Sequence, residues 1–208
     1  MNIAPGRAGS FDTLINTWTS DAGTARAVRV AAVLFITAAT AAAAQVSMPL
    51  GFTPVPLVLQ DVVVLLGGAA LGSRLGMTAQ ILYLLAGISG LPVFAASPVL
   101  PQGPLRLLGP TGGYLISYPF AAFLTGYLAE RGFDRRYMGS VVAMTAGLVV
   151  IFAFGVTWIA MFARPAAVGF DAALRTGFYP FVLGDIFKIL LGATVLPAAW
   201  KFLGRNPI

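Results

Sequence analysis

The chain has 208 residues, 58% of them hydrophobic and 10% charged, with a net charge of +6. Soluble domains carry roughly 25% charged and 45–50% apolar residues, so this composition excludes a water-soluble domain and indicates a membrane protein. Cysteine and histidine are absent, which removes disulfides, thiolate and imidazole metal sites, and the commonest general base.

Six windows are almost wholly apolar, and each is close to the ~20 residues that a helix needs to cross the hydrocarbon core. They lack the two-residue alternation of barrel strands. The sequence therefore predicts an all-α polytopic membrane protein, a bundle of six transmembrane helices, over residues 28–46, 55–71, 75–94, 111–128, 141–163 and 178–200.

We expect two parts: a cytoplasmic tail at residues 1–25 and one transmembrane domain over residues 26–208. The tail has a weak amphipathic run at residues 11–18, which we interpret as frayed chain rather than a helix in the headgroups. Nine of the basic residues fall on the tail, the turn between the second and third spans, the loop between the fourth and fifth spans, and the C-terminus. By the positive-inside rule both termini face the cytoplasm. The positive charge therefore reflects topology, and no basic surface for nucleic acid is visible.

The first apolar window is rich in alanine, and small residues recur four apart at Ala38 and Ala42 and at Ala39 and Ala43. Small residues let helix backbones approach closely in lipid. The pattern fits packing inside the bundle and a docking face for another membrane subunit equally well.

The connection at residues 47–56 holds three prolines and predicts an extended outer loop before the second span. Asp61, near the outer end of that span, can face a ligand, but we favour a solvated or capping carboxylate. Glycines then predict a tight cytoplasmic hairpin at Arg74. The third span contains Gly90 and Pro92, which predict a broken or kinked outer half.

The segment at residues 95–110, AASPVLPQGPLRLLGP, has four prolines and one charge, Arg106. The length and apolar character of this outer loop favour a lid over a solvated linker. Arg106 can bind a carboxylate as a bidentate fork or contact a lipid headgroup.

The motif LLGPTGGYLISYP follows, and its glycines include Gly112 and Gly113. Glycine allows a ligand to approach the backbone, and the amides at a helix N-terminus receive polar or anionic atoms, although a tight turn explains the motif equally well. Tyr114 is a candidate for the wall of a site or for the aromatic belt. No Gly-Lys-Ser/Thr follows, so no nucleotide hydrolysis is encoded.

Asp185 and Lys188 lie inside the apolar stretch FVLGDIFKIL. Three residues apart on a helix, their side chains point to one face and can converge on one object. Three interpretations are open: a structural ion pair, a proton relay, and the favoured one, a polar solute site. A carboxylate accepts hydrogen bonds and an ammonium donates them, so the pair suits an amide or urea.

The combination of GLPVF, LGPTGGYLISYP and FYPFVLGDIFKILL, in this order on a six-span chain, resembles the BioY family, the biotin-specific S components of energy-coupling factor transporters. The similarity covers about residues 28–203. The sequence departs from the family after LPVF, where members often carry a glycine-rich stretch and this chain has AASPVLPQGPLR.

The resemblance implies a high-affinity biotin-binding subunit in the cell membrane. Such a subunit is not an enzyme and binds no cofactor. It implies that Asp185 and Lys188 contact the ureido ring, and that Arg106, Tyr114, Gly112 and Gly113 are candidates for the valerate carboxylate and the pocket wall. It further implies partners: a transmembrane coupling protein, docking on the alanine-rich first helix, and ATP-binding-cassette ATPases that alone use ATP. An S component for another vitamin and an autonomous proton-coupled carrier are the alternatives.

Overall fold

The computed structural model describes residues 13–17, 22–96, 102–163 and 167–203. Most of the expected tail, at residues 1–12 and 18–21, and part of the expected lid, at residues 97–101, lie outside these ranges. The described elements, in chain order, are α1 (Leu14–Thr17), α2 (Ala22–Gln45), β1 (Ser47–Met48), β2 (Leu57–Val58), α3 (Gln60–Leu71), α4 (Ser73–Ile88), α5 (Leu105–Leu108), α6 (Gly112–Ala129), η1 (Phe133–Arg135), α7 (Tyr137–Met161), α8 (Phe170–Gly177), α9 (Tyr179–Gly192) and α10 (Val195–Phe202).

The predicted helical membrane bundle is confirmed. Among the described residues, three stretches are long and apolar enough to cross a bilayer: Thr24–Gln45, Tyr137–Met161 and Tyr179–Phe202. The other three expected spans correspond to α3, with 12 residues, α4, with 16, and α6, whose apolar run is interrupted by glycines, tyrosines and Pro119. The count of six membrane crossings therefore stays a prediction.

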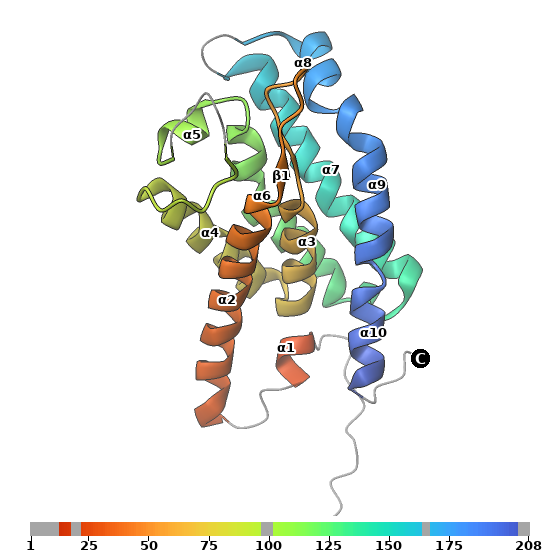
Figure 1. The fold of residues 1–208 in the computed structure, drawn as a ribbon. Coiled ribbons are helices and arrows are strands. Elements are labelled where there is room, and N and C mark those ends of the chain that lie inside the picture. Colours follow the sequence, from red (N-terminus) through yellow and green to blue (C-terminus); the bar gives the residue numbers. More distant parts are fainter. Residues whose placement is uncertain (1–12, 18–21, 97–101, 164–166, 204–208) are drawn as a thin grey trace, which may run out of the picture.

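The helices that are most buried lie at the centre of the molecule, and the less buried α2 and α9–α10 lie at its edges (Figure 1). α6 packs on α7, α3 and α4, whereas α2 and the α9–α10 pair flank this centre on opposite sides. Close packing needs small residues: a Cβ on Gly68 of α3 would lie 2.4 Å from the Ala122 carbonyl oxygen of α6. The exposed apolar faces of the edge helices are those that lipid or another membrane protein can cover.

The second span begins later than expected, because residues 55–59 are not helical. Prolines hold the connection extended, and β1 and β2 pair as a short antiparallel ribbon with Ser47 opposite Val58. The helix starts only at Gln60. The hairpin after α3 turns at Gly72, whose positive φ of 86° suits glycine, rather than at Arg74.

The expected break in the third span is present. α4 ends at Ile88, and the chain turns back so that Phe94, which is fully buried, packs on Tyr83 with ring centroids 5.5 Å apart. The sixth span is also divided, into α9 and α10, at Ala193 and Thr194.

The frayed-chain interpretation of the tail is wrong for residues 14–17. These form the short helix α1, and Ile15 is buried in a cluster with Val33, Leu71 and Ala79. Ile15, within the amphipathic run, thus packs on the protein rather than on headgroups.

Candidate functional site

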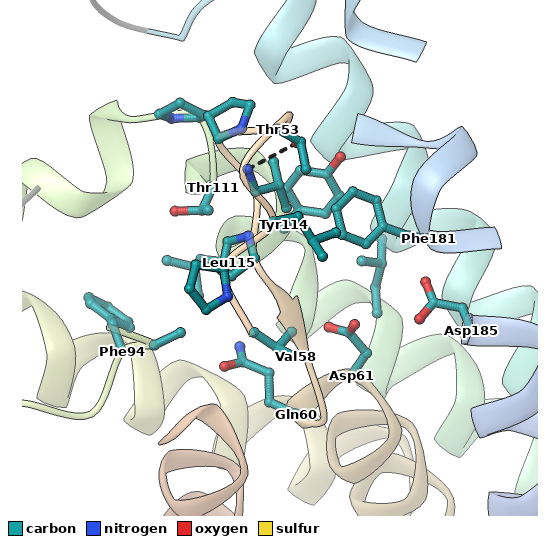
Figure 2. A pocket seen from close by; sticks show the side chains of 18 of the residues that line it. Thr53, Val58, Gln60, Asp61, Phe94, Thr111, Tyr114, Leu115, Phe181 and Asp185 are labelled. Carbon is teal, nitrogen blue, oxygen red and sulfur yellow. Dashed lines mark hydrogen bonds between the residues drawn. The ribbon is translucent and has the colours of Figure 1, made fainter. Parts of the chain in front are cut away.

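A cavity of about 640 Å³ lies between the connection that carries the ribbon and helices α3, α5, α6, α7 and α9 (Figure 2). Its volume falls within the roughly 300–1,000 Å³ of small-molecule sites. Most of its surface is apolar, and the aromatic wall residues are Phe94, Tyr114, Tyr118, Phe152 and Phe181. Four charged side chains also line it among the described residues: Asp61, Arg106, Asp185 and Lys188.

Asp185 and Lys188 meet as an ion pair on α9, at the cavity wall. Their side chains are only 5% and 15% exposed. The Lys188 Nζ also donates a hydrogen bond of 2.9 Å to the backbone oxygen of Val58, at the end of the ribbon. The three-residue spacing thus brings both groups to one point, and the ribbon holds the ammonium there.

Asp61 belongs to the same cluster, so the expectation that it is solvated or capping is wrong. Its Oδ2 lies 3.6 Å from the Lys188 Nζ, and its side chain is 14% exposed. Its Oδ1 accepts a hydrogen bond of 2.8 Å from the Tyr118 hydroxyl, which in turn accepts one of 2.6 Å from the Gln60 amide. Figure 2 shows Asp61 and Asp185 facing the same space from α3 and α9.

Sequence reasoning could have found Asp61 by the argument that found Asp185. Both are lone carboxylates in apolar helices, where an unpaired charge is costly. The contact of Gln60 with Tyr118 was missed because neither side chain is charged and the two residues are 58 positions apart in the sequence.

Arg106 lines the cavity from α5 and is 3% exposed, so the headgroup contact is the poorer of its two interpretations. Burial lowers the pKa of its guanidinium from the ordinary value, and the nearby Tyr83 opposes this effect. Burial without bulk water favours an anionic partner for this group.

Tyr114 forms part of the wall, as expected, but its hydroxyl is already committed. It donates a hydrogen bond of 2.5 Å to the backbone oxygen of Gly177, at the end of α8. Its ring stands edge-on to Phe152, with centroids 6.5 Å apart. The side chain therefore closes the cavity toward α7 and α8 mainly as an apolar surface.

Gly112 and Gly113 do not line the cavity. A Cβ on Gly112 would lie 1.8 Å from the Leu107 oxygen, and one on Gly113 would lie 2.2 Å from the Trp158 Cβ. The Trp158 indole donates to the Gly109 oxygen at 2.9 Å, behind the same turn. In this structure the two glycines allow α5, α6 and α7 to pack, which positions Arg106 and Tyr114.

These features define a helical integral membrane protein that encloses a mostly apolar cavity with a charged, hydrogen-bonding end, as a solute-binding membrane subunit does. The model of the BioY family matches residues 16–205. The chain belongs to the BioY family, as the sequence motifs predicted.

Named relatives cover most of the chain. It is 40% identical over 181 residues to the probable biotin transporter BioY of Pyrococcus horikoshii, an alignment spanning 87% of this chain and 99% of that protein. It is 36% identical over 159 residues to the biotin transporter BioY of Thermotoga maritima, spanning 76% and 88%. The crystal structure of the S-component for biotin from an ECF-type ABC transporter superposes with a TM-score of 0.77, covering 88% of this chain and 95% of that one at 23% identity, which shows a shared fold.

Proposed function

We propose that this protein is the biotin-binding membrane subunit of an energy-coupling factor transporter and takes up biotin. The observation that carries the proposal is the buried Asp185–Lys188 pair, which lies on the wall of a cavity of ligand size. The names of the relatives support the choice of solute, and the family is one of transport proteins rather than enzymes.

The chemistry of the cavity suits biotin at each of its parts. The ureido ring offers two N–H donors and one carbonyl acceptor, which match the Asp185 carboxylate and the Lys188 ammonium. The aromatic walls can enclose the apolar remainder of the molecule. Arg106 is the cation we assign to the valerate carboxylate. No cofactor is required in this subunit.

The proposal is tested by Lys188→Ala and Asp185→Asn. Each should weaken biotin binding at least tenfold, about 1.4 kcal/mol. The remaining charged residue of the pair and the ureido group would each lose a hydrogen-bonding partner in a buried site. Titration calorimetry on detergent-purified protein measures the change.

The exposed pair Asp171 and Arg175 on α8 provides a matched control. Asp171→Asn and Arg175→Ala remove the same kinds of charge from a helix but should leave the affinity unchanged. Wild-type affinity in both Lys188→Ala and Asp185→Asn would refute the site.

The proposed partners are a transmembrane coupling protein and ABC-type ATPases, which alone would consume ATP. We assign the docking face to α2, where Ala38 and Ala42 are exposed on one side, while Ala39 is half-buried and Ala43 is buried. Both interpretations of the alanine pattern can therefore hold: one pair faces outward and the other packs inside the bundle.

Ala38→Phe tests the docking face by preventing close helix approach. Recovery of the coexpressed coupling protein and ATPases with the tagged subunit should fall severalfold, while biotin affinity stays unchanged. Val149→Phe, on the exposed face of α7, is the control because Val149 is 61% exposed. Full recovery of the complex with Ala38→Phe would exclude this face.

A further inference from the structure

The charged end of the cavity carries more negative than positive charge. One ammonium, Lys188, lies between two carboxylates, in contact with Asp185 and 3.6 Å from Asp61. All three side chains are at most 15% exposed. The other charged residue among the described cavity-lining residues, Arg106, comes from α5.

The cluster also has more hydrogen-bond acceptors than donors. Two carboxylates offer about eight lone-pair sites, whereas an ammonium has three N–H groups. One of these N–H groups is used by the Val58 oxygen, and Tyr118 supplies a single further donor to Asp61. A ligand head that fits this end should therefore have more hydrogen-bond donors than acceptors, and it can be positively charged.

We propose that Asp61 is a specificity-determining residue that lets the cavity accept cationic cyclic guanidines in addition to neutral cyclic ureas. The inference rests on the proposed function, because it assumes that the ring head of the ligand lies at this cluster. A guanidinium replaces the urea carbonyl with further N–H groups. Asp61 and Asp185 can accept these from two sides, and the second carboxylate offsets the repulsion from Lys188.

The probe is 2-iminobiotin, in which a guanidine that is protonated at pH 8 replaces the ureido group. Calorimetry on the purified protein at pH 8 compares its Kd with that of biotin in wild type, Asp61→Asn and Asp61→Glu. Wild type should bind both ligands. In Asp61→Asn the ratio of the Kd for 2-iminobiotin to the Kd for biotin should rise at least about fivefold. Only the Asp185 carboxylate then remains to offset the positive charges of Lys188 and the ligand guanidinium.

The two variants separate charge from shape. Asn keeps the size of the side chain and an oxygen that can accept from Tyr118, so biotin binding itself reports that the fold is intact. Asp61→Glu keeps the charge and should keep the wild-type ratio of the two Kd values. Asp171→Asn removes an exposed carboxylate and should leave both affinities unchanged.

An unchanged ratio in Asp61→Asn would overturn the inference, since a purely structural role weakens both ligands alike. Failure of 2-iminobiotin to bind wild type at about 1 mM, a free energy near −4 kcal/mol, would overturn it as well. Both results leave biotin binding by wild type in place. Absence of biotin binding by wild type would instead refute the proposed function.

Discussion

At the scale of single residues, the ammonium of Lys188 is stabilised by three different elements. It contacts Asp185 within α9, the Val58 oxygen of the ribbon and Asp61 of α3. A buried charge is tolerated only when such partners offset its loss of hydration. Removing any one partner therefore affects the position of the ammonium as well as the local charge.

Arg106 should determine recognition of the carboxylate end of the ligand. We expect Arg106→Gln to weaken biotin binding at least tenfold, because this variant lacks the buried guanidinium that we assign to the valerate carboxylate. Binding of biotinamide, which lacks that charge, should change little. Calorimetry with both ligands measures the difference, and an equal loss for both would assign Arg106 a structural role.

The residues predicted from the sequence are those whose relation is local. Asp185 and Lys188 were predicted as a pair because the helix repeat alone fixes their relative direction. The contact of Tyr118 with Asp61 joins α6 to α3 across 57 residues, and no periodic pattern encodes it. The role of Gly113 was obscure for the same reason, since its close neighbour Trp158 comes from α7.

At the scale of elements, η1 and α10 are joined by a buried polar contact. Asp134 of η1 is fully buried, and its Oδ2 accepts a hydrogen bond of 2.7 Å from the indole of Trp200 in α10. Burial raises the pKa of this carboxyl from 3.8 to about 6, against the effects of Trp200 and Arg135. Asp134 lies in the loop between α6 and α7, outside the spanning segments.

This shift predicts a pH-dependent stability. The folded state holds the proton more tightly than the unfolded chain, so the contribution of Asp134 is greatest below about pH 4 and is lost as the pH rises through about 6. The loss amounts to roughly 3 kcal/mol at most. Thermal unfolding in detergent should show a smaller decrease between pH 4.5 and 7.5 for Asp134→Asn than for wild type.

Asp171→Asn, which removes a solvent-exposed carboxylate, should follow the wild-type profile. If Asp134→Asn showed the same decrease as wild type, the carboxyl would have to be ionised in the folded protein at both pH values.

Element boundaries were predicted well where a single residue type decides them and less well elsewhere. The break near Gly90 and Pro92 was visible in the sequence. The ribbon was not, because the prolines at residues 49, 54 and 56 indicate only that the chain is extended, whereas pairing of Ser47 with Val58 depends on the loop that joins them. Residues 55–59 are apolar enough for a span, which placed the start of the second helix too early.

At the scale of the whole molecule, the described chain has two distinct ends (Figure 1). α8 and α5 lie at the end that holds the cavity, and α1, the start of α2 and α10 lie at the other. The distribution of basic residues predicts that the second end is cytoplasmic. The bundle itself was predictable because hydropathy depends on composition, but which helices lie at the centre depends on glycine contacts such as Gly68 on Ala122.

Single cysteines test this orientation, since the natural chain has none. Asp171→Cys on α8 should react with a membrane-impermeant maleimide in intact cells, because the Asp171 side chain is 83% exposed. Phe202→Cys, at a position 93% exposed on α10, should react only after permeabilisation. The reverse pattern would place the termini outside.

The ribbon has a mechanical consequence. It follows α2 directly, and the Leu59 N–H bonds back to the Val46 oxygen at 3.2 Å, so the segment has little slack. Its last strand residue, Val58, supplies the carbonyl that fixes Lys188. About a dozen residues of covalent chain therefore connect the end of α2 to the Val58 carbonyl oxygen. A neighbouring membrane protein that moves α2 should also move this oxygen and, with it, the Lys188 ammonium. Binding of a partner to α2 and binding of the solute near Lys188 should therefore be coupled. A movement of α2 that displaces the Val58 carbonyl should weaken solute binding.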